Sequence, residues 1–295
     1  MDEKPAVRPD RAVGEALRAV ARDVLAEARA ALENQGDATA VHDYRKAMKR
    51  WRSLLRLLQR FLGEGGQQLR IEARDSAREL AGARDAQAAL DALADIAKHQ
   101  DTLSERTVAS MRARLEDVRA HAEGTTLTQA MRARLVIALD NAGDRVSAWQ
   151  LDTITFDQLA GELAKTYRRL RSDAPDEDWA TVPPDELHEL RRRVVQHRYQ
   201  MELVEPLWPK FGKVWTAEAQ RLRDRLGANQ DLSMLQRFTE PHGPLAPWRS
   251  RLMPLILQRQ AAHAKASERI ARRLLADKPR AFRDRLETLW KSSQR

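Results

Sequence analysis

Residues 41–58 read VHDYRKAMKRWRSLLRLL, and this stretch has the pattern of an amphipathic helix. On a helical wheel with about 100° per residue, its apolar side chains fall on one side. They are Tyr44, Met48, Trp51, Leu55 and Leu58, with Leu62 just beyond the stretch. Apolar residues at this spacing are typical of a helix that packs against a protein core.

A second, narrow stripe of the same wheel is basic. It consists of His42, Arg45, Lys49, Arg52, Arg56 and Arg60, and Lys46 and Arg50 lie beside it. Like charges at these spacings repel each other by about 0.2–0.5 kcal/mol per pair. No acidic residue lies between Lys49 and Arg60. Acidic residues of a neighbouring helix or a bound anion must therefore offset the repulsion.

The same pattern recurs in residues 187–204, which read LHELRRRVVQHRYQMELV. The offset of 188 − 42 = 146 residues pairs His42 with His188, Arg45 with Arg191 and Arg52 with Arg198, and further along Leu80 with Leu226 and Asp85 with Asp231. A register that continues beyond one helix indicates an internal repeat. We therefore expect two related helical halves, at about 10–150 and 153–293.

The second copy carries fewer basic residues than the first. Val195 stands at the position of Lys49, and Glu202 stands at the position of Arg56. Glu202 follows Arg198 by four residues, a spacing at which a carboxylate can hold a guanidinium on a helix. The sequence thus predicts an asymmetric site to which the first copy contributes more.

The rest of the chain is rich in Ala, Leu, Arg, Glu and Gln, with apolar residues three and four apart, which predicts an all-α fold. We expect about ten to twelve helices, at 10–34, 38–62, 66–82, 85–100, 104–122, 125–150, 155–173, 184–206, 211–228, 231–239, 243–276 and 279–293. Glycine-rich turns at 63–66 and loops at 172–178 and 241–244 separate some of them.

The composition favours anionic partners. Lys and Arg outnumber Asp and Glu by 52 to 43, giving a net charge of +9. The absence of cysteine fits a reducing compartment, and the start of the chain has no apolar core typical of a signal peptide. We expect a cytoplasmic protein with no membrane span.

Two sets of motifs give the chain a resemblance to a known family. The run from His42 to Arg56 followed by Leu80-Ala81-Gly82-Ala83-Arg84-Asp85, and the run from His188 to Glu202 followed by Leu226-Gly227-Ala228-Asn229-Gln230-Asp231, resemble the two halves of a CHAD domain, the conserved histidine α-helical domain. Tyr167-Arg168-Arg169 also fits this family. Val195, Gln196 and His197 depart from the usual pattern of the second half.

The resemblance implies a single CHAD domain over residues 1–295. It implies two pseudo-twofold-related antiparallel bundles around a basic central groove, binding of inorganic polyphosphate, and association with polyphosphate granules or polyphosphate-metabolising enzymes. The expected polyphosphate-binding residues are His42, Arg45, Lys46, Lys49, Arg50, Arg52, Arg56, Arg168, His188, Arg191, Arg192 and Arg198. The expected orienting residues are Asp85, Asp231 and Glu202, with both aspartates interpreted mainly as helix N-caps.

Other interpretations of the same residues stay open. A basic stripe also suits nucleic acid, although this one lacks the aromatic residues on which single strands usually stack. An enzyme acting on a phosphoanhydride is a further alternative, but His42-Asp43 lacks further ligands at metal-binding spacing. We therefore expect a binding protein with no catalytic residues, no metal and no cofactor.

Overall fold

The computed structural model describes residues 5–34, 36–80, 84–99, 102–122 and 127–294, and every regular element within these ranges is helical. The prediction of an all-α fold is therefore confirmed. The α-helices are α1 (Val13–Glu33), α2 (Asp37–Leu57), α3 (Gln59–Glu79), α4 (Arg84–His99), α5 (Glu105–Ala122), α6 (Gln129–Ser147), α7 (Phe156–Ser172), α8 (Pro184–Val204), α9 (Pro209–Phe238), α10 (Arg249–Leu274) and α11 (Pro279–Ser292). Two short 3-10 helices, η1 (Glu205–Leu207) and η2 (Ala246–Trp248), precede α9 and α10.

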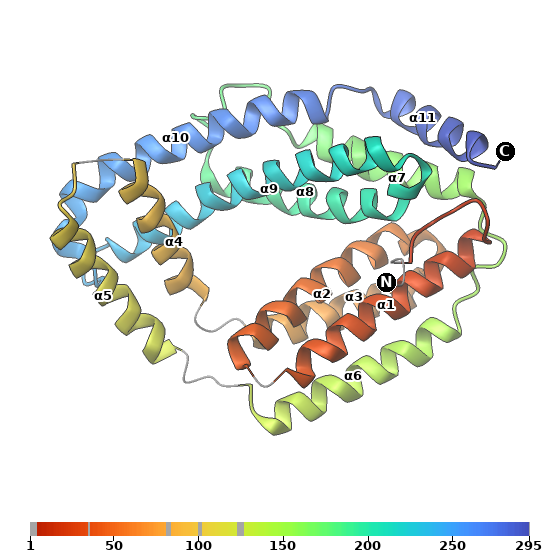
Figure 1. Ribbon diagram of the computed structural model, residues 1–295, viewed down its shortest axis with the longest axis horizontal. Helices are drawn as coiled ribbons and strands as arrows, with labels where there is room; N and C mark the ends of the chain where they lie inside the picture. Colours follow the sequence, from red (N-terminus) through yellow and green to blue (C-terminus); the bar gives the residue numbers. More distant parts are fainter. Residues whose placement is uncertain (1–4, 35, 81–83, 100–101, 123–126, 295) are drawn as a thin grey trace.

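The helices form two layers that meet along α2 and α8 (Figure 1). In the first layer α1 packs on α2 and α6, and α2 packs on α3. In the second layer α8 lies between α7 and α9, while α10 packs on α9 and α11 on α7. At the meeting of the layers, the hydroxyl of Ser53 donates a buried hydrogen bond of 2.9 Å to the backbone oxygen of Gln196. This contact places α2 directly against α8.

Helices α4 and α5 lie beside the second layer, although they precede it in the chain. Helix α4 contacts α9, α10 and α5 (Figure 1), and a separate apolar cluster including Leu93, Ile96 and Leu252 lies between them. Asp95 accepts hydrogen bonds of 2.8 and 2.9 Å from Arg259 and one of 2.9 Å from His263. Segment 84–122 is thus attached to the second half of the chain, and the division into halves at 150 stays a prediction.

The apolar face of α2 is buried as the wheel predicts. Tyr44, Met48, Trp51, Leu55 and Leu58 are each at most 2% exposed. Trp51 stacks on Trp149 with ring centroids 5.8 Å apart. Because these side chains fix the rotation of α2 about its axis, the basic stripe must lie on the other sides of the helix.

Two predicted helix boundaries are wrong. The chain turns at Leu58, between α2 and α3. At the predicted turn, 63–66, the structure has only a kink within α3, at Gly63, whose φ of 55° is non-helical. No break follows Leu226, because α9 continues through Gly227 to Phe238. One glycine costs a helix about 1 kcal/mol, and the buried Leu226, Leu232 and Leu235 offset that cost.

Within the described ranges, no helix is long and apolar enough to cross a membrane. Charged residues recur on every helix, and they occupy the faces that the two apolar clusters leave free. The position of these charges on the two layers defines the candidate site.

Candidate functional site

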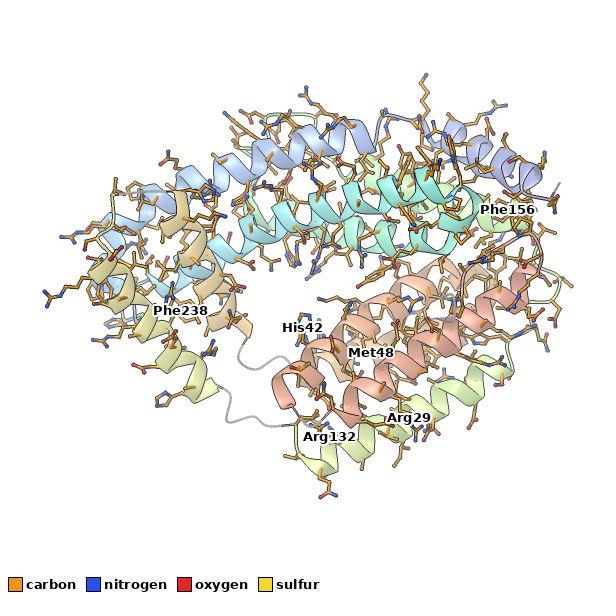
Figure 2. All side chains as sticks on the ribbon, in the orientation of Figure 1. Arg29, His42, Met48, Arg132, Phe156 and Phe238 are labelled. Carbon is orange, nitrogen blue, oxygen red and sulfur yellow. The ribbon has the colours of Figure 1, made fainter. Side chains whose placement is uncertain are left out.

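The basic residues of α2 divide into two environments. His42 and Lys46 are exposed, and Figure 2 shows His42 near the N-terminal end of α2, on the side of the first layer that faces the second. Arg52 and Arg56 are partly buried where α2 meets α8. Among the described residues, neither Arg52 nor Arg56 forms an ion pair with a carboxylate.

Arginines of three other helices surround Arg52 and Arg56. Burial lowers the pKa of the Arg52 guanidinium, and neighbouring positive charges lower it further: Arg70, Arg192, Arg74 and Arg78. Burial also lowers the pKa of Arg56, and again other arginines add to the effect: Arg70, Arg193, Arg52 and Arg169. We call these eight residues the arginine cluster: Arg52, Arg56, Arg70, Arg74, Arg78, Arg169, Arg192 and Arg193.

The cluster concentrates positive charge where α2, α3, α7 and α8 come together. An arginine remains charged at neutral pH even with a lowered pKa. Guanidiniums that are partly withdrawn from water repel each other more than they would on an open surface. The Nε atom of Arg52 is buried without a hydrogen-bond partner in the described structure. An anion at this place would supply both the acceptor and the opposite charge.

Within the described residues, three members of the cluster pair with carboxylates, and the charge of Asp75 also interacts with that of Arg52. Asp75 accepts a bond of 2.8 Å from Arg74, its neighbour in sequence. Asp173 pairs with Arg193 at 2.9 Å, and Glu189 pairs with Arg192 at 2.6 Å on an exposed surface. Solvent-exposed ion pairs of this kind contribute at most about 1 kcal/mol. These arginines can therefore exchange a carboxylate for another anion at small cost.

The arginines of the two His-x-x-Arg motifs each pack against the helix that follows. Arg45 donates to the backbone oxygens of Ala77 and Leu80, at 3.1 and 2.8 Å, at the end of α3. Arg191 donates to Gln230 at 3.3 Å, and a Cβ atom at Gly227 would come within 3.3 Å of its Nε. Both arginines thus hold the fold together as well as adding charge. Gly227 allows the guanidinium to lie close to α9.

His188, the histidine of the second His-x-x-Arg motif, is more enclosed than His42, the histidine of the first. His188 is partly buried, and its Nδ1 has no hydrogen-bond partner in the described structure. Burial lowers the pKa of His188, a hydrogen bond with Gln230 opposes this, and the charges of Arg192 and Arg191 lower it further. His188 is therefore a neutral hydrogen-bonding group near pH 7, beside positive charges.

Several predicted site residues lie apart from the arginine cluster. Arg50 points to α1, where it forms ion pairs of 2.8 Å with Asp23 and 2.9 Å with Glu27. Arg198 donates to Glu202 at 2.5 Å, which confirms the expected pair, and lies over the ring of Tyr199. Arg168 is exposed, and its neighbour Arg169 is the residue of α7 that approaches Arg56. Lys49 is partly buried on α2.

The interpretation of the two aspartates as N-caps changes with the structure. Asp231 lies inside α9 rather than before a helix, so its assignment as an N-cap is wrong. Asp85 lies in the first turn of α4, where a carboxylate interacts favourably with the helix dipole. Ala83, the residue before α4, lies outside the described residues, as do Ala81 and Gly82 of the first motif.

The predicted binding residues leave out five members of the cluster, although Arg169 belongs to the Tyr167-Arg168-Arg169 motif: Arg70, Arg74, Arg78, Arg169 and Arg193. A signal was present for three of them. Arg70, Arg74 and Arg78 recur every four residues, which places them on one side of α3. For Arg169 and Arg193 the sequence did not select the residue, because each is one of several adjacent arginines and only packing decides which one faces α2.

The fold and this site define an all-helical protein with clustered arginines at the meeting of two helical layers. The family model of the CHAD domain matches residues 15–240, more than half of the chain, so the chain belongs to the CHAD domain family. The crystal structure of the CHAD domain from the plant Ricinus communis is similar, with a TM-score of 0.54 and 18% identity over 97% of this chain and 95% of that chain. That likeness concerns the fold alone. No curated protein matches the chain significantly.

Proposed function

We propose that this CHAD domain protein binds inorganic polyphosphate at the arginine cluster. The observation that carries the proposal is the environment of Arg52 and Arg56, whose largest interactions with neighbouring charges are with other arginines and which form no ion pair with a carboxylate among the described residues. A fold that keeps such charges together bears a free-energy cost. A bound polyanion would remove that cost.

Polyphosphate suits the chemistry and spacing of the cluster. The planar fork of a guanidinium donates two parallel hydrogen bonds to phosphate oxygens and stays charged. Arg52 and Arg56 are four residues apart, which is about 6 Å along the helix axis. The row Arg70, Arg74 and Arg78 repeats this spacing on α3. An extended chain of phosphates can contact successive arginines of both helices.

In this proposal the polymer follows a basic groove between the layers. The two halves, related by a pseudo-twofold axis, both contribute residues to this groove. The contact of α2 with α8 through Ser53 and Gln196 supports the placement. The first copy contributes Arg52 and Arg56, while the second contributes Arg192 and Arg193. His42 and His188 would donate hydrogen bonds to phosphate at the flanks.

A binding assay with polyphosphates of defined length across a salt series tests the proposal. Each phosphate contact releases condensed counterions, so affinity should fall steeply as salt rises. A matched protein with Arg52→Gln should show a weaker salt dependence and lower affinity. Absence of saturable binding by the folded protein at low salt would refute the proposed function.

Nucleic acid is the alternative that the same assay separates. Tyr44 and Trp51, the aromatic residues of α2, are buried in the core and so cannot stack on bases. We expect polyphosphate to displace RNA or single-stranded DNA at equal concentrations of phosphate. If RNA or single-stranded DNA instead displaces bound polyphosphate, nucleic acid is the favoured ligand.

We further propose a binding protein rather than an enzyme. Among the described residues, no group of His, Asp or Glu side chains is placed to hold a metal ion. When the protein is incubated with polyphosphate and divalent cations, no phosphate should be released from the polyphosphate. Metal-dependent release by the pure protein, abolished by a substitution in the arginine cluster, would overturn this part of the proposal.

The proposed cellular partner is the polyphosphate granule or an enzyme that handles polyphosphate, in the cytoplasm. A fluorescent fusion of the protein should gather at granules in cells that accumulate polyphosphate. The fusion with Arg52→Glu and Arg56→Glu should remain diffuse, because the arginine cluster then loses its central charges.

A further inference from the structure

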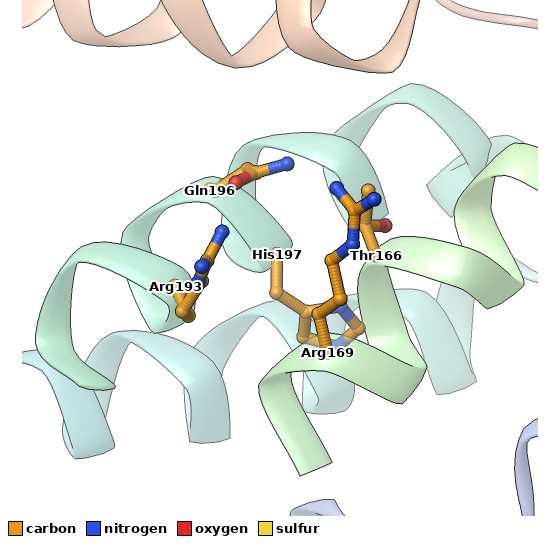
Figure 3. Close-up of a pocket in the computed structure, with 5 residues that line it drawn as sticks. All are labelled: Thr166, Arg169, Arg193, Gln196 and His197. Atoms are coloured by element: carbon orange, nitrogen blue, oxygen red, sulfur yellow. The ribbon is translucent and has the colours of Figure 1, made fainter. Parts of the chain in front are cut away.

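A small pocket lies next to the arginine cluster, between α7 and α8. Its lining consists of Thr166 and Arg169 from α7 and Arg193, Gln196 and His197 from α8 (Figure 3). Arg169 and Arg193 are also among the charged neighbours of Arg56, so the pocket adjoins the proposed polyphosphate site. Figure 3 shows both arginine side chains rising from the two helices, with His197 beneath them.

The floor of the pocket holds a buried hydrogen-bond donor without an acceptor. His197 is 1% exposed, and its Nε2 accepts a bond of 2.8 Å from the indole N–H of Trp215. Burial lowers the pKa of His197 to about 3, so the imidazole is neutral. The single proton of a neutral imidazole whose Nε2 accepts must be on Nδ1. That Nδ1–H has no partner in the described structure.

Two guanidiniums, those of Arg169 and Arg193, line the same pocket. Gln200, one turn beyond Gln196, accepts a bond of 2.6 Å from the hydroxyl of Thr166, and its amide nitrogen is buried without a partner in the described structure. A buried donor without an acceptor costs about 1–3 kcal/mol. The described part of the pocket is lined by no carboxylate, although Asp173 pairs with Arg193 at 2.9 Å from outside. The missing partner is thus an acceptor, and the charges favour an anion.

The pocket is closed at its inner end. The rings of Tyr167, Phe282 and Trp215 pack around His197, with centroids 5.6 to 6.1 Å from the imidazole. The pocket has no room for a water molecule in the observed arrangement, so a ligand can enter only if side chains of the lining move. Arg169 is exposed and the side chain of Arg193 is 31% exposed, so both can move outward. A ligand can therefore enter from the cluster but cannot pass through.

We infer that this pocket receives the terminal phosphate of a polyphosphate chain, which fixes one end of the polymer beside the arginine cluster. The inference rests on the proposed function. A terminal phosphate resembles a phosphate monoester, with three acceptor oxygens and about −1.5 to −2 charge near neutral pH. An inner phosphate has fewer free oxygens and must continue in two directions. A closed pocket that contains two guanidiniums and a buried imidazole N–H without a partner among the described residues suits the end of a chain.

Binding of linear and cyclic polyphosphates of matched net charge tests the inference, because the cyclic form has no terminal phosphate. We expect the protein to bind the linear form about tenfold more tightly, which equals about 1.4 kcal/mol, the contribution of one charge-assisted hydrogen bond. Arg169→Gln should abolish this preference and Thr166→Val should reduce it. Lys165→Gln is the control, since it removes one charge from α7 at an exposed ion pair with Glu162.

A second readout follows His197 itself in the unmodified protein. The Nδ1–H resonance of His197 in proton–nitrogen spectra of the imidazoles should shift on addition of linear but not of cyclic polyphosphate. Equal affinity for the two forms together with an unchanged His197 resonance would overturn the inference while leaving polyphosphate binding in place. Failure to bind either form would overturn the proposed function and the inference together.

Discussion

Helices α2 and α8 occupy the same register of the internal repeat, yet they hold their cations differently. On α2, Arg52 and Arg56 have arginine neighbours and pair with no carboxylate among the described residues. On α8, Arg198 corresponds to Arg52 but donates to Glu202 and lies over Tyr199. The comparison shows that Arg52 keeps its charge available for an anion, whereas the equivalent Arg198 is paired within its own helix.

The buried faces differ as well. Trp51 of α2 stacks on Trp149, while His197, at the equivalent position of α8, accepts a hydrogen bond from Trp215. Arg50 of α2 pairs with Asp23 and Glu27, while Gln196 replaces it on α8. The first copy is thus specialised for charge and apolar packing, and the second contains a buried polar group that can titrate.

Reversing the central charges of α2 should have the largest effect. Arg52→Glu with Arg56→Glu should weaken polyphosphate binding by on the order of a hundredfold or more, since each lost charge-assisted contact costs about 1.5–3 kcal/mol. Calorimetric titration measures this. The control is Arg221→Glu with Arg225→Glu on α9, an equal change of charge on exposed residues. An equal loss in the control would mean that net charge, not the arginine cluster, determines affinity.

Acid should destabilise the protein through α8 rather than α2. Burial lowers the pKa of His197 from 6.5 to about 3, so the unfolded chain takes up a proton in this range and the folded chain does not. The contribution of the neutral His197 to the free energy of unfolding is complete above about pH 6.5 and declines as the pH falls towards 3. Urea unfolding at several pH values measures this, with His197→Gln as the comparison. A variant with the same pH dependence as the natural chain would contradict this role of His197.

Removing Arg50 should affect stability more than binding. Its side chain is 12% exposed and holds α2 to α1 through Asp23 and Glu27, whose side chains are 26% and 37% exposed. Because these acids are partly solvated, Arg50→Ala should lower the free energy of unfolding by about 1–2 kcal/mol. Polyphosphate affinity at a temperature where the variant is folded should change little. A loss of affinity as large as that of Arg52→Gln would place Arg50 in the binding site after all.

The smallest expected difference compares the equivalent arginines of the two copies. Arg52→Gln should weaken binding about tenfold, whereas Arg198→Gln should weaken it about twofold, because Glu202 already accepts from Arg198. Arg52→Gln should also raise the unfolding free energy of the ligand-free protein by a few tenths of a kcal/mol, through relief of repulsion. Thermal unfolding with and without polyphosphate measures both effects. Equal losses of affinity would show that the two copies contribute symmetrically.

The sequence by itself determined the fold class, the rotation of α2 and the internal repeat. These follow from local periodicity, because burial of an apolar face fixes which residues of a helix face the core. The row Arg70, Arg74 and Arg78 was also visible as spacing on one helix. The pair of Arg198 with Glu202 followed from a separation of four residues, and the structure contains it.

Only the tertiary structure decided which cations remain without carboxylates. Arg50 and Arg52 are two residues apart on one helix, yet Arg50 meets the acids of α1 and Arg52 meets the arginines of α3 and α8. Similarly, packing selects Arg169 over Arg168 and extends α9 through Asp231. The sequence gives the order of the charges along the chain. The electrostatic field at a guanidinium, however, is the sum of contributions from every helix that packs around it. That packing depends on contacts between residues more than a hundred positions apart.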